Sequence, residues 1–593
     1  MDQVRWVLFS ISVFLIAGSQ EKLFKNDDLM VSWQEEGGGN VHIMGSWMKT
    51  NKNTTFASFQ GIPYAEPPVL QSRFLRPNKF QYNSSLTEID ARGTFQTVCP
   101  QPGYFISMSE DCLYLNIYAA ENIEVLKPVM VWIHGGAFFG GDGTWDSFGP
   151  QHFLDQDVVM VTLNYRLGAL GFLSLGNSEV PGNMGLWDQH TALTWVHQHI
   201  IHFGGDPDQV TLFGESAGSW SLLYHLLSGK SKGLFQRIIG ESGSPLSTSW
   251  GYIPTEVASR NGELFAEMVD CPLSDLACFQ NLSLDTLLNH STYLDDPTDY
   301  SEFKSGNPWN GVLDKDFTDD PFLPDTPLKI LENGDFDQSV QLILGANQDE
   351  GLYETSVLYF NPDLYAEMSS NWSHYGPVWL LGRTGLGDIT EEDKEVAGDI
   401  LEYYTGSRDT ITHDDFFAVT AMKTDAEFWP SIDTTVSILS GHGVQVHHYI
   451  FSYRGEHSIL DYSGVEPGLY GVSHADELFY LFDPLLHIDL EDMIERDKSI
   501  RNLLVSCWAS FAKYGDPTPP GSSFTWTPVT GDSRLYFNIS GTEPGMEKRE
   551  DYENRVQFWS TLNDQNQTSG TKQFIIEVQL VTLMGLIGLK SWL

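Results

Sequence analysis

The stretch Val210-Thr211-Leu212-Phe213-Gly214-Glu215-Ser216-Ala217-Gly218 decides the fold of this 593-residue chain. Its apolar start predicts a short buried strand, and the amphipathic residues 217 to 227 predict a helix directly after it. The Gly-x-Ser-x-Gly between them permits the sharp, strained turn that exposes a serine hydroxyl. The stretch therefore predicts a strand, a tight turn and a helix, with Ser216 as a candidate nucleophile.

Other short apolar runs are typical of buried strands, and longer amphipathic stretches lie between them. The expected strands are 129–133, 158–163, 340–344 and 444–451, and further expected helices are 188–202 and 500–513. This alternation predicts an α/β fold with a mostly parallel sheet flanked by helices. No repeat or linker divides the chain, so we expect a single domain over residues 20–560. The polar residues 361–415 predict a helical insertion over the sheet and the active site.

A second glycine motif, His134-Gly135-Gly136-Ala137, follows the expected strand 129–133. Its small residues let backbone N–H groups approach a carbonyl oxygen, as stabilisation of an oxyanion requires. A plain glycine turn is the alternative. The motif precedes Gly-x-Ser-x-Gly, which is the chain order that an α/β-hydrolase uses, so the pair favours a serine hydrolase.

Longer blocks resemble the type-B carboxylesterase and cholinesterase family and extend from about residue 61 to 517. The matching blocks are Gly61-Ile62-Pro63-Tyr64-Ala65-Glu66-Pro67-Pro68, Glu110-Asp111-Cys112-Leu113-Tyr114-Leu115-Asn116, Asn164-Tyr165-Arg166, Phe203-Gly204-Gly205-Asp206-Pro207 and Phe511-Ala512-Lys513-Tyr514-Gly515-Asp516-Pro517. The resemblance implies one α/β-hydrolase domain and is strongest to general carboxylesterases of the arthropod type. It also implies two disulfides, Cys99 with Cys112 and Cys271 with Cys278.

The same resemblance implies the other members of a catalytic triad. The acid is expected to be Glu350 in Asp349-Glu350-Gly351, although the residues alone do not choose between Asp349 and Glu350. The base is expected to be His474, in Gly471-Val472-Ser473-His474-Ala475-Asp476-Glu477-Leu478. The order serine, acid, histidine is that of the α/β-hydrolases. We therefore expect ester hydrolysis through an acyl-enzyme intermediate.

The resemblance further implies an oxyanion hole formed by the N–H groups of Gly136, Ala137 and Ala217, with Gly135 adjoining. Many relatives have a third glycine where this chain has Ala137. A methyl group leaves the N–H group available, so we expect activity to survive with a narrower acyl pocket.

Two alternatives to a general esterase stay open. The first is a cholinesterase, in which a long disulfide loop carries a tryptophan that stacks on choline. Here only twelve residues, Pro100 to Asp111, lie between Cys99 and Cys112, and none is tryptophan. The second is a non-catalytic adhesion protein similar to neuroligins, which the complete triad positions disfavour.

Charge and composition restrict the partners of the protein. The 33 basic and 79 acidic residues give a net charge of −46, which disfavours nucleic acid and anionic membranes as partners. A small-molecule ester is the expected partner, and the sequence does not predict an oligomeric state. We expect no cofactor and no metal. His197, His199 and His202 could suggest a metal site, but their helical spacing turns His197 away from the other two.

The first 19 residues have the features of a cleaved signal peptide, with an apolar run of twelve residues from Trp6 to Ala17 and the small residues Ala17-Gly18-Ser19 at its end. Such a run is too short to span a bilayer, which needs about 20 residues. Secretion agrees with seven Asn-x-Ser/Thr glycosylation sites, at Asn53, Asn83, Asn281, Asn289, Asn371, Asn538 and Asn566.

Residues 561–593 are expected to form a C-terminal tail, with an apolar segment at 574–589. The segment could be a lipid-anchor signal that holds the protein at the cell surface, which would be its only membrane contact. An amphipathic helix or a frayed tail is the alternative. The fifth cysteine, Cys507, lies in an apolar helical stretch and is expected to be a buried structural thiol.

Overall fold

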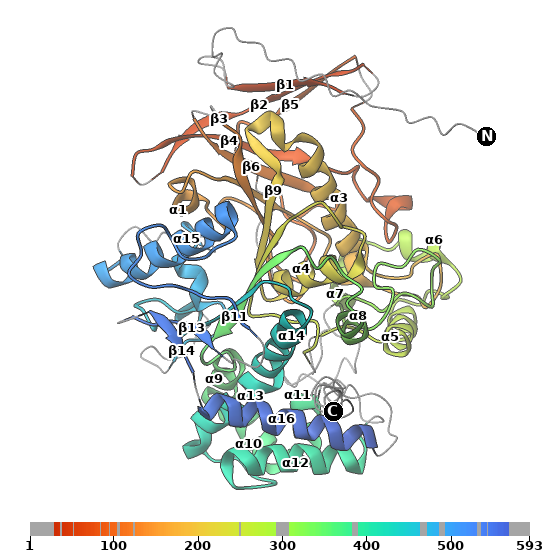
Figure 1. The fold of residues 1–593 in the computed structure, drawn as a ribbon. Coiled ribbons are helices and arrows are strands. Elements are labelled where there is room, and N and C mark those ends of the chain that lie inside the picture. The colour runs from red at the N-terminus through yellow and green to blue at the C-terminus, as the bar shows by residue number, and fades with distance from the viewer. Residues whose placement is uncertain are drawn as a thin grey trace, which may run out of the picture.

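The computed structural model describes residues 29 to 568 except 36–37, 51, 83–84, 94, 96, 103–106, 122–124, 248–250, 292–307, 382–388, 463–470, 486–492, 531–534, 542–543 and 549. The expected signal peptide, Asn83 and the apolar segment 574–589 lie outside the described residues. A large sheet runs through the molecule, with helices on both of its faces (Figure 1). The α/β architecture expected from the sequence is confirmed. No helix in the described ranges is both long and apolar enough to cross a membrane.

The large sheet has eleven strands in the order β14-β13-β12-β11-β10-β9-β7-β8-β6-β4-β3. The strands from β8 to β13 pair in parallel, and the strands at both edges pair antiparallel. The parallel strands are β7 (Lys127–Trp132), β8 (Val159–Leu163), β9 (Gly205–Glu215), β10 (Arg237–Glu241), β11 (Gln341–Asn347), β12 (Val446–Phe451) and β13 (Tyr536–Ile539). The antiparallel strands are β3 (Ser46–Lys49), β4 (Thr55–Pro63), β6 (Tyr114–Ala120) and β14 (Gly545–Glu547).

The strands expected from apolar runs are present with ends that differ by a few residues. Every residue of β8 and of β12 is buried, as parallel strands covered on both faces require. Alternate residues of β7 pack into two separate cores, Val129 and Val131 in one and Met130 and Trp132 in the other. The sheet thus separates two hydrophobic cores, which accounts for the continuous apolar runs.

The N-terminal strands were not predicted. β1 (Met30–Gln34), β2 (Asn40–Met44) and β5 (Leu86–Asp90) form a separate three-stranded sheet at the top of Figure 1. Residues of β1 alternate between exposed and buried, because this sheet buries only one face. Such strands are too short and too polar to stand out as apolar runs.

Helices cover the large sheet on opposite faces. The expected helices are α3 (Met184–His199), α4 (Ala217–Ser228) and α15 (Glu495–Tyr514). Residues of α3 and α4 pack in the core with Val129, whereas α15 packs in the other core with Trp132. Since β8 and β9 lie on opposite sides of β7, the strand order reverses at β7, and such a reversal places functional loops at the carboxyl ends of the strands.

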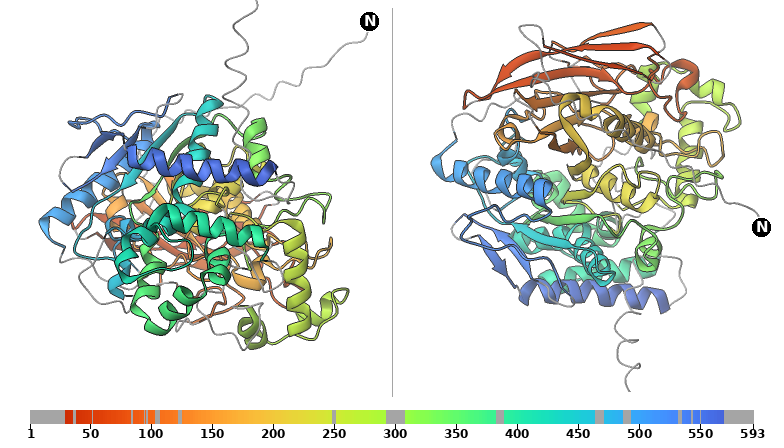
Figure 2. Two further views of the ribbon diagram at one scale, coloured as in Figure 1. Left: turned by 90° about the horizontal axis from the view of Figure 1, so that it is seen from below. Right: turned by 45° about the horizontal axis from the view of Figure 1, so that its top comes forward.

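The helical insertion expected at 361–415 is confirmed for its described residues. Within the expected bounds lie α10 (Pro362–Ser370), α11 (Trp372–Leu381) and α12 (Glu391–Thr405). The flanking helices α9 (Leu352–Phe360), α13 (Phe416–Glu427) and α14 (Trp429–Gly441) extend the helical region beyond them. The C-terminal helix α16 (Glu550–Thr568) lies across these helices (Figure 2), and its Trp559 and Leu562 join their hydrophobic core. Residues 561 to 568, assigned to the tail from sequence, continue this helix.

Both expected disulfides are present. Cys99 and Cys112 are joined with a Cα–Cα distance of 5.1 Å, and Cys271 and Cys278 with one of 5.7 Å. Cys507 is a free, fully buried thiol in α15, where burial raises the pKa of Cys507 well above its usual value. It is therefore a packing residue rather than a reactive one.

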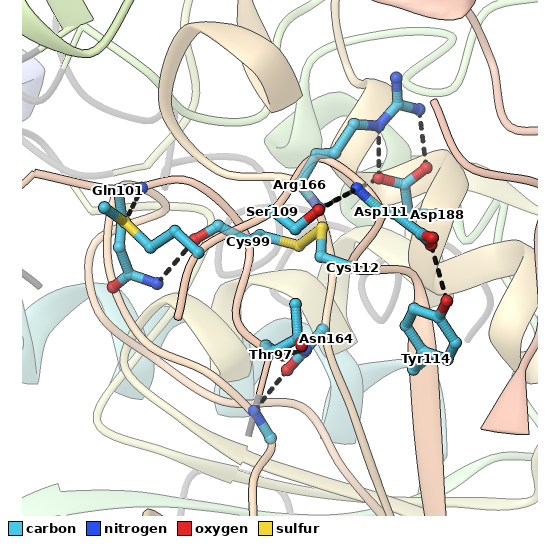
Figure 3. The surroundings of a disulfide bond; sticks show 12 residues. Thr97, Cys99, Gln101, Ser109, Asp111, Cys112, Tyr114, Asn164, Arg166 and Asp188 are labelled. Atoms are coloured by element: carbon cyan, nitrogen blue, oxygen red, sulfur yellow. Dashed lines mark hydrogen bonds and ion pairs between the residues drawn. A yellow bond between two sulfur atoms is a disulfide. The ribbon is translucent and has the colours of Figure 1, made fainter. Parts of the chain in front are cut away.

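A buried ion pair lies close to the first disulfide (Figure 3). Arg166 donates from Nε and Nη2 to the two carboxylate oxygens of Asp188, each at 2.7 Å, and from Nη1 to the carbonyl of Leu75. The side chains are 3% and 0% exposed. Asp188 also accepts the Arg166 N–H, so this pair ties the segment after β8 to α3.

Arg166→Met is expected to lower the free energy of unfolding by about 3–5 kcal/mol, because it leaves a buried carboxylate without its partner. The matched control is Arg92→Met. Arg92 makes the same two-point pair with Asp90, but both side chains are more than half exposed. Denaturant unfolding should separate the variants, with the Arg92 variant close to wild type. Equal midpoints for the two would contradict the importance of burial.

Candidate active site

The turn after β9 holds Ser216 in a strained backbone conformation. Its φ is +55° and its ψ is −124°, and its N–H donates to the carbonyl of Glu241 at 2.8 Å. The glycines on either side allow close packing: a Cβ on Gly214 would lie 2.6 Å from the Ile133 carbonyl oxygen, and one on Gly218 would clash with the same atom. The sequence motif therefore forms the sharp strand-to-helix turn that was predicted.

The second glycine motif packs directly against this turn. A Cβ on Gly135 would lie 2.7 Å from the carbonyl oxygen of Glu215 and 3.1 Å from the Cβ of Ser216. Gly136 has a φ of +104°, and its carbonyl accepts the N–H groups of residues 139 and 140. Ala137 has a φ of +51°. The N–H of Gly136 donates to no residue that the structure describes, so it is available to a ligand beside Ser216.

His134 shapes the start of this loop and does not titrate near neutral pH. Its Nδ1 lies 2.8 Å from the carbonyl of Gly135, so this nitrogen carries the proton. The ring stacks on Tyr165 at 4.4 Å between ring centres, and burial lowers the pKa of His134 to about 4. Gln101, beside the first disulfide, exchanges two hydrogen bonds with Gly141. The loop is therefore anchored on both sides.

His474 and Glu350 meet although they are 124 residues apart. His474 Nδ1 lies 2.6 Å from Glu350 Oε2. The other oxygen of Glu350 accepts the hydroxyl of Ser242 at 2.5 Å and the N–H of Asn347 at 2.7 Å. The Glu350 side chain is completely buried. These contacts fix one carboxylate oxygen for the imidazole and hold the other in place.

Asp349, the alternative acid in the sequence, faces the backbone of the histidine loop. Its Oδ2 accepts the N–H of Val472 at 3.0 Å, and its own N–H donates to the carbonyl of Val472 at 3.0 Å. Glu350, not Asp349, therefore contacts the imidazole of His474.

Glu215 was not recognised from the sequence as a site residue. Its Oε1 lies 3.0 Å from His474 Nε2, within ion-pair distance. The hydroxyl of Ser216 makes no hydrogen bond with a described residue. In this structure Nε2 thus faces Glu215 rather than the serine. The only signal in the sequence was the position of Glu215 directly before Ser216 in the turn.

The carboxylates around His474 favour a charged imidazole. Burial alone would lower its pKa, but Glu215 and Glu350 outweigh burial and raise the pKa of His474 well above its usual value. Two further buried glutamates lie close enough for these charges to change their pKa values. Burial raises the pKa of Glu241 and the pKa of Glu477 well above the usual range, and Glu215 adds to both shifts. The neutral acid is therefore favoured at Glu241 and Glu477.

Two aromatic residues from the helical segments that flank the expected insertion lie beside the imidazole. The ring of Phe428 lies 5.0 Å and that of Tyr353 6.1 Å from the His474 ring, between centres. A buried lysine joins the residue that follows Tyr353 to the residue that precedes Phe428. Lys423 Nζ lies 3.1 Å from Glu354 and 2.7 Å from Glu427. This ion-pair cluster links α9 to α13, so these two helices, which flank the expected insertion at 361–415, border the site.

Other residues singled out from the sequence lie away from this site. His202 stacks on Trp33 at 5.0 Å, and His199 lies 5.1 Å from the same ring. Across the described ranges, no three His, Cys, Asp or Glu side chains are arranged to hold a metal ion.

The glycosylation sites differ in exposure. Asn538 lies in β13, where its amide accepts from Ser452 and donates to Glu547. Asn566 lies on α16. The remaining described sites are exposed: Asn53, Asn281, Asn289 and Asn371. Glycosylation stays a prediction at all seven positions.

Comparison with known proteins agrees with this geometry. The chain is 34% identical to a carboxylic ester hydrolase of Bombus ignitus over 566 residues, which cover 91% of this chain and 97% of the relative. It is 34% identical to juvenile hormone esterase of Tribolium castaneum, over 80% of this chain and 83% of that protein. It is 30% identical to acetylcholinesterase 1 of Caenorhabditis elegans, over 85% and 84%. A model described as "Carboxylesterase family" matches residues 37–559. The chain therefore belongs to the carboxylesterase family of α/β-hydrolases.

Proposed function

We propose that the protein hydrolyses carboxylic esters with Ser216 as nucleophile, His474 as general base and acid, and Glu350 as the residue that orients the histidine. The observation that carries the proposal is the 2.6 Å contact between His474 and the buried Glu350, at the same end of the sheet as the serine turn. A histidine held in this way has a fixed tautomer, with Nε2 left for the substrate side.

The reaction follows the usual course for such a triad. His474 Nε2 takes the proton of Ser216 Oγ as the oxygen attacks the ester carbonyl carbon. The tetrahedral intermediate collapses, and the alcohol leaves with the proton from Nε2. Water, deprotonated by Nε2, then hydrolyses the acyl-enzyme. Before the first step the imidazole must give up its contact with Glu215, because Nε2 has to accept a proton.

The oxyanion is proposed to bind the N–H groups of Gly136, Ala137 and Ala217. Ala217 is the first residue of α4, where the helix dipole also favours negative charge. The positive φ of Ala137 costs more for alanine than for glycine. The methyl group narrows the space beside Ala137 without removing its N–H group.

A general carboxylesterase is favoured over a cholinesterase. The loop closed by Cys99 and Cys112 is short and contains no tryptophan that could stack on choline. The aromatic side chains that do flank His474 are Tyr353 and Phe428. We further propose that the protein is exported. The apolar N-terminal run and the two disulfides support export, and one relative is named a venom carboxylesterase.

Ser216→Ala is expected to abolish labelling by a fluorophosphonate and to lower kcat on the order of 10⁶-fold, because no other group can form the acyl-enzyme. Labelling is measured by intact mass, with Ser499→Ala on the surface of α15 as the control. A folded wild-type protein that does not label would sink the enzyme hypothesis and favour the adhesion alternative.

Glu350→Gln is expected to lower kcat about 10⁴-fold, because an amide no longer stabilises the imidazolium or enforces its tautomer. Asp349→Asn should lose no more than roughly tenfold, the value of one hydrogen bond to a charged group. Steady-state kinetics on p-nitrophenyl acetate compare the two. The reverse ranking would assign the acid to Asp349.

Glu215→Gln should shift the acidic limb of the kcat/KM–pH profile to lower pH by about one unit. In the wild type the carboxylate raises the pKa of His474, so the neutral base forms only as the pH rises through that raised value. Removing the charge lets the base form at lower pH. The control is Glu88→Gln, an exposed change of equal charge in β5. A limb that stays in place or moves to higher pH would refute the role of Glu215.

A further inference from the structure

The described residues 471–475, which carry His474, have no regular secondary structure, and a 3-10 helix begins at Asp476. Polar side chains hold the peptide groups just before the imidazole. Asn347 Nδ2 donates to the carbonyl of Ser473 at 2.7 Å. Asp349 accepts the N–H of Val472 at 3.0 Å. Asp476 accepts the N–H of Ser473 at 2.9 Å. The position of the imidazole therefore depends on side-chain hydrogen bonds.

Asp476 makes the most extensive of these connections. Besides Ser473, its carboxylate accepts the hydroxyl of Ser458 at 2.8 Å and the N–H of Ile459 at 2.9 Å. It thus joins the histidine loop to a segment 17 and 18 residues earlier in the chain. Asp476 is 2% exposed, so water does not compete for these bonds. The carboxylate thus joins these two segments through three hydrogen bonds.

Only a carboxylate satisfies this arrangement. Three donors converge on its two oxygens, and an ionised carboxylate has acceptors alone. An asparagine would present its NH₂ group to at least one of these donors. Burial raises the pKa of Asp476 to about 7, while its hydrogen bonds and the charge of Arg454 act to lower it. The ionised form is thus accessible above neutral pH, where His474 has to act as a base.

We propose that Asp476 is a positioning residue: it fastens Ser473 to the segment at 458–459 and thereby holds the His474 imidazole against Glu350 and within reach of Ser216. The inference rests on the proposed function for its effect on catalysis. The effect on the Glu350–His474 contact does not depend on that function.

Asp476→Asn tests the proposal, with Asp461→Asn as the matched control. Asp461 accepts the N–H of Ser458 at 2.9 Å, on the same segment, and its carboxylate lies 3.7 Å from Arg454, but among the described residues it has no hydrogen bond to residues 471–476. Asp476→Asn is expected to lower kcat on p-nitrophenyl acetate roughly 10- to 100-fold with KM within about twofold, because the base is displaced while the substrate site is retained. Asp461→Asn should keep wild-type kinetics.

A second readout reports on the contact itself. The proton shared by His474 Nδ1 and Glu350 should give a low-field ¹H NMR resonance, assigned by its absence in Glu350→Gln. Asp476→Asn should broaden or remove this resonance at temperatures well below unfolding, and Asp461→Asn should retain it. If Asp476→Asn does not fold, Ser458→Ala removes one of the three bonds and should lower kcat roughly threefold to tenfold.

Wild-type kcat and an unchanged resonance in folded Asp476→Asn would overturn the proposal, and so would equal losses in Asp476→Asn and Asp461→Asn. A wild-type protein that neither hydrolyses esters nor labels at Ser216 would instead overturn the proposed function. The resonance would still show in that case whether Asp476 holds His474 against Glu350.

Discussion

The site depends on the close approach of two backbone segments, the end of β7 and the turn after β9. Three glycines permit it: Gly214 and Gly218 face the Ile133 carbonyl, and Gly135 faces the carbonyl of Glu215. Any side chain at these positions would force the segments apart. Because β7 and β9 are paired neighbours at the point where the strand order reverses, the oxyanion loop and the serine turn emerge side by side. The glycines let these two segments pack closely enough to form one site.

The charge balance of the site follows from what the sheet ends bring together. Glu215 and Glu241 end adjacent paired strands, and Glu350 follows the next strand along. Several buried carboxyl groups cannot all be ionised without a cation, and His474 is the group placed to compensate. The charges of Glu215 and Glu350 contribute both to the raised pKa of His474 and to the raised pKa of Glu477. A net charge of −46 makes no comparable contribution, because charges at the surface are screened.

The sequence predicted those parts of the fold and site whose conformation depends on residues close together in the chain. The buried strands, the serine turn and the glycine loop follow from short runs in which neighbouring residues determine the conformation. Glu350 and His474 could be assigned only through family resemblance, since their contact spans 124 residues and seventeen histidines compete. Glu215 and Asp476 were missed because their roles appear only when distant segments meet. The alternating pattern of β1 was available in the sequence, but it is short and polar.

Ser216 and His474 acquire their positions by different physical means. Ser216 is held by sterics, because its turn is wedged against β7 and has no room to relax. His474 lies on a loop, and its position comes from hydrogen bonds to carboxylates that are themselves titratable. Steric restraint is insensitive to pH, whereas a carboxylate loses acceptor strength when it is protonated. Acid should therefore disorder the base of the triad before the nucleophile, so that the serine turn remains formed when the histidine no longer meets it.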